Sequence, residues 1–211
     1  MDRWVRNLVM SVIGWLAPEL EAVDLNPRSS SVKQILLVRA NFRMGNAVLA
    51  LPAIAAFRKN FPDARIDFVG SPISALLFQH QPLHCHYNTP RHFPQAVWQY
   101  PRLIRSLRAN RYDLAVDLSC SHSGLAAFII GLSRARIRAG ITGKWDRAFN
   151  LKTAKPRSRN KYGKLTEFLT ALGLQDIESP GSIQFSPAEK AEGNKRLQLL
   201  VGQNSGKVVG V

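Results

Sequence analysis

Polar residues and one glycine gather directly after two apolar runs of the sequence, at 35–38 and at 112–118. They are Arg39, Arg43, Gly45 and Asn46 after the first run and Ser119, Ser121 and His122 after the second. Guanidinium groups, hydroxyls and the free backbone N–H groups at a helix N-terminus can all bind an anion. We therefore interpret both groups as parts of a ligand site at the carboxyl ends of strands.

The elements around the first group form a βαβ unit. Ile35–Val38 is apolar without alternation, which is typical of a strand buried on both faces. Asn46 can cap a helix whose apolar positions extend to Phe57, with a kink or a short first turn at Pro52. A second strand follows at 66–69. In an open parallel sheet, the loop after the first strand lies where ligands bind.

The rest of the chain continues the alternation of strands and helices. We expect strands at 83–87 and 112–118, and helices at 73–78, 93–110, 125–132, 165–174 and 186–200. Ser71 begins the first of these helices on the ligand side, Pro101 interrupts the second, and Gly173 ends the fourth. Ser186 and Glu189 form a capping box in the last one. The alternation predicts an α/β fold: a Rossmann-like, mostly parallel twisted sheet with helices on both faces.

The charge of the chain indicates an anionic partner. Lys and Arg total 29 against 14 acidic residues, a net charge of +15. Eleven of these cations lie at 134–164 beside a single acid, Asp146, and the block includes Lys144 and Trp145. Such a block is a mobile solvated loop or a surface that meets a sugar phosphate, a lipid headgroup or a single-stranded nucleic acid. We expect no nucleic-acid partner, because the sequence holds no nucleic-acid-binding motif.

The cysteines, the histidines and the N-terminal segment indicate the cellular environment of the chain and whether it binds a metal. Two cysteines without a CxxC pair are too few for a disulfide framework or a zinc site, which favours a reduced, cytoplasmic environment. His84 and His86 alternate in an expected strand without a third ligand nearby, so we predict no metal. Residues 1–31 are predicted to form an amphipathic helix with Trp4 and Trp15, followed by a linker; this helix could lie in a membrane interface or on the domain's own surface.

These segments together resemble glycosyltransferase family 9, the heptosyltransferases of lipopolysaccharide core synthesis. The resemblance is carried by Arg39, Gly45–Asn46, Leu51–Ile54, Phe61–Ala64, Ile66–Val69, Tyr112–Leu118 and Leu132–Ile141. It implies the N-terminal half of a two-domain GT-B glycosyltransferase, with an acceptor-side domain at 32–206. Residues 207–211 would then begin a donor-binding domain that the sequence does not contain.

The resemblance also implies an activity. It is an inverting, metal-independent and cofactor-free transfer of heptose from an ADP-sugar to a lipopolysaccharide core acceptor, at the cytoplasmic face of the inner membrane. The family has its catalytic aspartate where this chain has Asn46, and an amide cannot take up a proton. We assign acceptor binding to eight residues: Arg39, Arg43, Gly45, Ser71, Ser119, Ser121, His122 and Lys144.

Two other functions compete with this hypothesis. The substitution at Asn46 and the end of the sequence at Val211 favour a truncated or degenerate half that binds acceptor, membrane or a partner without turnover. A generic nucleotide-binding protein rests on the fold alone, since no G-x-G-x-x-G follows the first strand. If the catalytic base does not belong at position 46, Asp117 and His122 are the next candidates for it.

Overall fold

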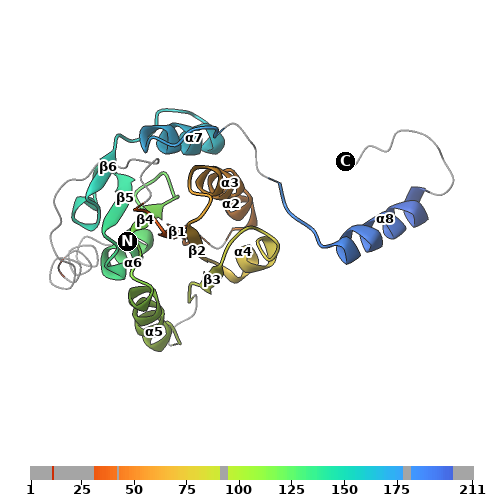
Figure 1. Cartoon of the computed structure of the whole chain (residues 1–211), viewed down its shortest axis with the longest axis horizontal. Coiled ribbons are helices and arrows are strands. Elements are labelled where there is room, and N and C mark those ends of the chain that lie inside the picture. Colours follow the sequence, from red (N-terminus) through yellow and green to blue (C-terminus); the bar gives the residue numbers. More distant parts are fainter. Residues whose placement is uncertain (1–10, 12–30, 42, 91–94, 178–181, 202–211) are drawn as a thin grey trace.

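The computed structural model describes residues 31–41, 43–90, 95–177 and 182–201, together with residue 11 (Figure 1). The predicted N-terminal helix and the predicted strand at 207–211 lie outside these residues. The described part contains a six-stranded sheet in the order β3-β2-β1-β4-β5-β6, and all five pairings are parallel. The strands are β1 Gln34–Val38, β2 Arg65–Gly70, β3 Cys85–Asn88, β4 Leu114–Asp117, β5 Ile137–Ile141 and β6 Leu151–Thr153.

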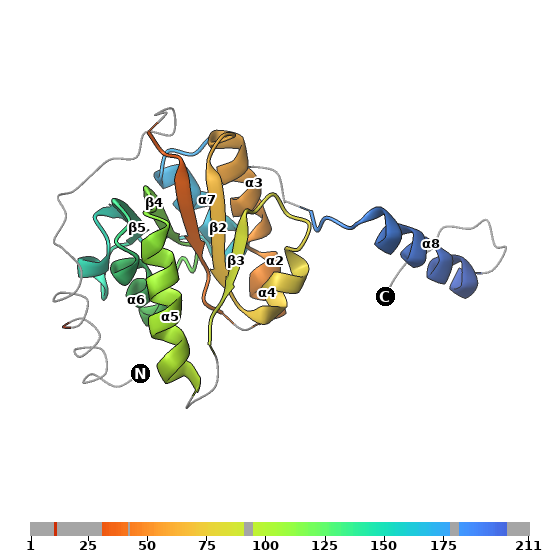
Figure 2. The same ribbon diagram turned by 60° about the horizontal axis from the view of Figure 1, so that its bottom comes forward.

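Helices cover both faces of this sheet, as predicted for an α/β fold (Figure 2). One face carries α2 Met44–Val48, α3 Leu51–Asn60, α4 Pro72–Leu77 and α7 Lys161–Ala171, and the other carries α5 Gln95–Ala109 and α6 Gly124–Ser133. β1 supplies both cores: Ile35 and Leu37 pack on one side, Leu36 and Val38 on the other. The continuous apolar run of this strand therefore has the double burial that the sequence indicated.

The strand order reverses between β1 and β4. β1 pairs with β2 on one side and with β4 on the other, so that Val38 lies opposite both Val69 and Asp117. The chain returns from β3 across the sheet to β4 through α5. Loops on the two sides of such a reversal diverge, which leaves a crevice at the carboxyl ends of the strands. Both groups of polar residues found in the sequence follow these two strands.

The helix expected after β1 is divided into two. α2 ends at Val48 and α3 begins at Leu51, with Pro52 in the first turn of α3, where proline is tolerated. Asn46 does not cap this helix, because α2 already begins at Met44 with Arg43 as its N-cap residue. Pro101 does not interrupt α5, which continues to Ala109. Burial of Leu103, Ile104 and Leu107 holds the second half of α5 on the sheet.

The basic block at 134–164 is not the mobile solvated loop that its charge suggested. It contains β5, the short 3-10 helix η1 Asp146–Ala148, β6 and the start of α7. Arg138 and Trp145 are buried, with 2% and 3% of their surface exposed. Trp145 packs in the core beside α6, so it is not available to stack on a sugar or a lipid headgroup. The surrounding lysines and arginines concealed β5, whose residues other than Arg138 are small or apolar.

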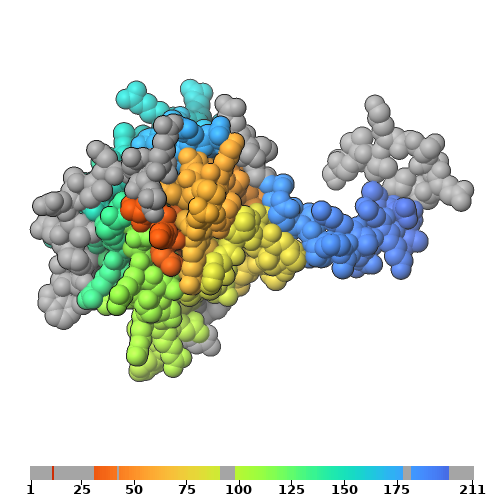
Figure 3. Space-filling model, in the orientation of Figure 1, coloured from red at the N-terminus to blue at the C-terminus, as the bar shows by residue number. Residues whose placement is uncertain are grey.

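A last helix, α8 Pro187–Val201, projects from the sheet domain (Figure 3). Its predicted capping box is confirmed: the Ser186 hydroxyl accepts from the Glu189 N–H at 3.2 Å, and the Glu189 carboxylate accepts from the Ser186 N–H at 2.7 Å. The same carboxylate contacts the turn after α4 through Gln79 and His80. None of the described helices is long and apolar enough to cross a bilayer.

Candidate functional site

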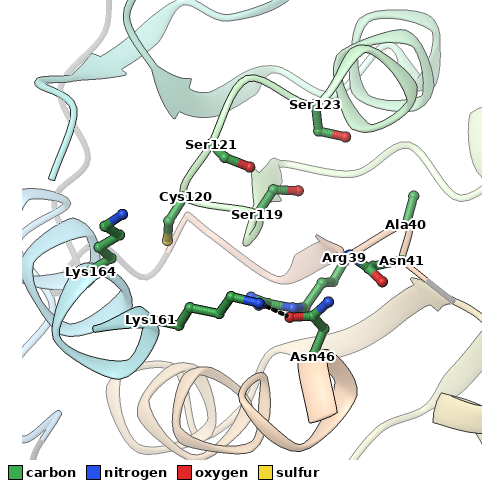
Figure 4. A pocket seen from close by; sticks show the side chains of 10 residues that line it. All are labelled: Arg39, Ala40, Asn41, Asn46, Ser119, Cys120, Ser121, Ser123, Lys161 and Lys164. Carbon is green, nitrogen blue, oxygen red and sulfur yellow. Dashed lines mark hydrogen bonds between the residues drawn. The ribbon is translucent and has the colours of Figure 1, made fainter. Parts of the chain in front are cut away.

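A polar cavity of about 210 Å³ lies in the crevice between the loops that follow β1 and β4 (Figure 4). Its described lining residues are Arg39, Ala40, Asn41, Asn46, Ser119, Cys120, Ser121, Ser123, Lys161 and Lys164. They come from three places: the β1–α2 loop together with α2, the β4–α6 loop, and the first turn of α7. The strand order brings the first two together, and α7 closes the cavity from the side.

Arg39 forms the floor of this cavity at the end of β1. It is 8% exposed, and its Nη1 donates to the carbonyl oxygen of Leu118, the residue directly after β4. Its Nε has no hydrogen-bond partner among the described residues. Burial lowers the pKa of this guanidinium, while the nearby Cys120 and Asp117 oppose the shift. The group nevertheless stays charged, because the ordinary pKa of an arginine lies far above neutral pH.

Asp117 lies at the end of β4, below the cavity lining. It is 3% exposed, and its Oδ1 accepts the backbone N–H of Ser119 at 2.8 Å. Burial raises the pKa of Asp117 to about 6, against the opposing effects of the side-chain and backbone hydrogen bonds of Ser119 and of the charge of Arg39. A carboxyl group with such a pKa can exchange a proton near neutral pH. However, Asp117 is not among the residues that line the cavity.

Asn46 and Lys161 meet across the cavity. The Lys161 Nζ donates to the Asn46 Oδ1 at 2.9 Å, although the two residues are 115 positions apart in the sequence. Asn46 projects from α2 and is 7% exposed, and Lys161 is the first residue of α7 (Figure 4). Asn160 caps α7 by accepting the Gly163 N–H at 2.6 Å, which fixes where the lysine enters.

The β4–α6 loop supplies hydroxyl groups and the start of a helix. Ser123 is the N-cap of α6 and accepts the Ala126 N–H at 3.3 Å. Cys120 has a left-handed backbone with φ of 49°. Burial raises the pKa of its thiol to about 12, despite the nearby Arg39 and Lys164. Cys120 therefore remains a thiol near neutral pH, which argues against the Cys–His nucleophile that Cys120 and His122 could have formed.

Comparisons with known proteins show that this fold is shared with glycosyltransferases. No family model matches the chain. Lipopolysaccharide heptosyltransferase 3 of Escherichia coli is 25% identical over 171 residues, which cover 76% of this chain and 49% of that protein. Together with the solved structures below, this supports a resemblance to the glycosyltransferase family 9 heptosyltransferases.

Solved structures of this family share the fold. The glycosyl transferase family 9 protein of Veillonella parvula superposes with a TM-score of 0.70 at 15% identity, over 91% of this chain and 53% of that one. The E. coli heptosyltransferase WaaC with ADP-2-deoxy-2-fluoro heptose gives 0.56 at 16% identity, over 71% and 51%. E. coli ADP-heptose LPS heptosyltransferase II gives 0.56 at 19%, over 78% and 50%. The chain therefore spans about half the length of its family 9 relatives.

Four of the residues proposed from the sequence line the cavity: Arg39, Asn46, Ser119 and Ser121. The other five do not. Arg43 and Gly45 are exposed at the start of α2, and Ser71 is buried as the N-cap of α4. His122 points away toward Gly143, beside the exposed Lys144. Their assignment to acceptor binding stays a prediction for a family 9 relative.

The sequence did not single out several lining residues: Asn41, Ser123, Lys161 and Lys164. Lys161 and Lys164 were counted only as members of the basic block, because the helix was expected to begin at Leu165. Asn160 was the signal that could have corrected this, since an asparagine before a run without proline is a good helix cap. Two lysines three positions apart at a helix start would then have been placed on one face.

Proposed function

We propose that this chain is the acceptor-side half of a glycosyltransferase of the heptosyltransferase type. It would take heptose from an ADP-sugar donor and pass it to a lipopolysaccharide core acceptor, in an inverting reaction without a metal. The observation that supports this most is the cation-lined cavity at the strand-order reversal of a fold shared with heptosyltransferases. Under this proposal, residues 32–206 form the acceptor-side domain, and most of the donor site belongs to a second domain.

The chemistry needs a group that takes up a proton. The acceptor hydroxyl oxygen bonds to the anomeric carbon while the bond to the diphosphate oxygen breaks, and the hydroxyl proton must leave. Asn46 lies in the cavity but its amide has no basicity, and its Oδ1 already accepts from Lys161. An aspartate at position 46 would place a carboxylate at the same point, where the ammonium group of Lys161 would stabilise its negative charge. In this chain, the position proposed for the catalytic base is therefore occupied by a residue that cannot take up a proton.

The substitution Asn46→Asp tests the proposal. At saturating donor and acceptor it should raise sugar transfer at least about tenfold, because general-base assistance contributes about 10²–10⁴-fold to such reactions. Transfer from ADP-heptose to a deacylated core acceptor is measured for both proteins, alone and with the donor-binding domain of a related heptosyltransferase added. A rapid wild type that Asn46→Asp leaves unchanged or slows would contradict Asn46 as the base position. Asp117→Asn and His122→Gln would then be measured in the same assay.

A second function is favoured by one observation. The amide of Asn46 and the absence of a carboxylate among the described lining residues suit a half that binds without turnover. Such a protein would hold acceptor, membrane or a partner subunit. The same assay distinguishes this second function. Neither the wild type nor the Asn46→Asp variant would transfer sugar, while both would still bind the core acceptor.

We propose further that the chain works at the cytoplasmic face of the inner membrane, on anionic lipid. Support comes from α5, where Trp98, Arg102 and Arg105 lie on one exposed face and Trp98 is 72% exposed. Beside them, α5 and α6 enclose an apolar groove of about 400 Å³. It is lined by Tyr100, Pro101, Ile104, Arg105, Arg108, Phe128 and Leu132. An exposed tryptophan among arginines next to apolar surface is suited to the interface of an anionic bilayer.

A further inference from the structure

The cavity at the strand-order reversal contains three cations and, among its described lining residues, no acid. Arg39, Lys161 and Lys164 supply the positive charge. Two carboxylates lie near enough to be considered. Asp117 sits below Arg39, outside the lining, and Glu167 of α7 turns away to accept the backbone N–H groups of Arg157 and Ser158. Neither is among the described lining residues, and Asp117 offsets part of the charge of Arg39 only, so the charge of the two lysines is left for a ligand to balance.

Asn46 sets the position of one of these cations without neutralising it. The Lys161 ammonium donates one hydrogen bond to the amide oxygen at 2.9 Å, and an ammonium group has three N–H donors. A carboxylate at position 46 would form an ion pair with Lys161 and would repel a second anion. An amide of the same size orients the lysine and leaves its full charge available. This property belongs to the asparagine and would disappear in an aspartate.

The other lining groups suit an anion with several oxygens. Arg39 is more than nine-tenths buried, and its Nε is unpartnered among the described residues. Ser121 and Ser123 contribute hydroxyls, which can donate, and the cavity opens beside the N-terminus of the ten-residue helix α6. A buried guanidinium, two ammonium groups, hydroxyls and a helix N-terminus together are suited to a phosphate group.

We infer that this cavity binds a phosphate group directly, with Lys161, oriented by Asn46, as a principal ligand beside Arg39 and Lys164. The inference rests on the proposed function for the source of that phosphate, which is either the diphosphate of the sugar donor or a phosphate carried by the acceptor. The chemistry recognised is the same in both cases. The position that would hold a base in an active relative serves here to keep an anion site charged.

The test measures binding of inorganic phosphate to the whole chain by isothermal titration calorimetry, with sodium chloride used to hold the ionic strength constant. Lys161→Gln should weaken binding at least about tenfold, because a charge in direct contact with the anion is removed. Asn46→Asp should weaken it by a similar factor, at least about tenfold, by adding a negative charge. The matched control is Lys195→Gln, which removes one positive charge from the exposed α8 and should leave affinity unchanged.

The inference is overturned if the wild type binds no phosphate at matched ionic strength, if Lys161→Gln binds like Lys195→Gln, or if Asn46→Asp binds as tightly as the wild type. Thermal melts without phosphate show that each variant folds. Binding of ADP and of a sugar monophosphate is then compared to identify the source of the phosphate. The compound that binds more tightly, and whose binding is weakened by Lys161→Gln, carries the recognised group. Phosphate binding without sugar transfer would remove the proposed function alone, and transfer without phosphate binding would remove this inference alone.

Discussion

Asp117 is the residue whose environment has the clearest thermodynamic consequence. Its pKa is about 6 in the folded protein because burial disfavours the charged carboxylate, against an ordinary value of 3.8. Between these values the folded protein binds the proton more tightly than the unfolded chain does. The contribution of Asp117 to stability is therefore greatest below about pH 4, falls as pH rises toward 6, and stays low above that.

The substitution Asp117→Asn should remove this dependence. An amide needs no deprotonation, and its oxygen can still accept the Ser119 N–H. We expect the Asp117→Asn variant to gain stability relative to wild type as pH rises from 4 to 6, by on the order of 3 kcal/mol at most, since one pKa unit is about 1.4 kcal/mol. Urea unfolding of both proteins at pH 4, 5, 6 and 7.5 measures the difference. A difference that stays constant with pH would show that Asp117 does not titrate in this range.

At this scale, sequence reasoning found the residues whose position is set locally. Arg39 and Ser119 each follow a recognisable buried strand, so their place at the carboxyl edge could be predicted. The partner of Asn46 could not be predicted, because Lys161 reaches it only through the packing of α7 on the sheet. Local pattern carries no information on which distant side chain will donate to the amide oxygen.

Among the elements, α6 ends in a conformation that its sequence does not favour. Its C-cap residue, Arg134, has a left-handed backbone with φ of 61°, where a side chain is strained and glycine is not. Arg134 is exposed, and its positive charge repels that of Arg108. Both facts indicate that the arginine side chain can be removed without loss of packing.

We expect Arg134→Gly to raise the free energy of unfolding by about 0.5–1 kcal/mol, because the relief of strain exceeds the entropy that glycine adds to the unfolded chain. The matched control is Arg102→Gly, which makes the same change at an exposed position inside α5 and should lower stability by about 1 kcal/mol. Chemical unfolding measures both variants. If both are destabilised alike, the left-handed residue is not a source of strain.

The elements that sequence reasoning missed share a physical cause. β5 and β6 lie in a segment so rich in lysine and arginine that its inward residues, such as Ala139 and Leu151, were outweighed. Arg138 is an extreme case, since this strand buries a guanidinium that any charge-based prediction places on the surface. In contrast, β1, β2 and β4 were predictable, because apolar runs without charge have few alternatives to a buried strand.

At the scale of the whole molecule, the excess of positive charge predicts salt-dependent attraction to anionic lipid. We expect replacement of Trp98 by Ala together with Arg102 and Arg105 by Gln to lower binding to anionic vesicles at least about tenfold, since each basic residue at such a surface contributes about 1 kcal/mol. Co-sedimentation at two salt concentrations measures this, and higher salt should weaken binding of the wild type.

A second set of substitutions compares the basic block with α5. Replacement of Arg157, Arg159, Lys161 and Lys164 by Gln removes more charge but leaves the exposed tryptophan in place. If this set weakens vesicle binding while the α5 set does not, the block and not α5 faces the lipid. Binding that neither set nor salt affects would exclude an electrostatic role for both surfaces.

The hydrogen bond between Asn46 and Lys161 also has a consequence for the order in which parts of the protein fold during synthesis. The loop after β1 leaves the ribosome early, but the lysine that completes the cavity lies 115 residues later. During synthesis the sheet can begin to form from β1 and β2, whereas the cavity is complete only after α7 has been synthesised and has packed on the sheet. Contacts so distant in sequence form late, because the intervening chain must already be ordered. Possession of a complete cavity therefore marks a domain that has finished folding.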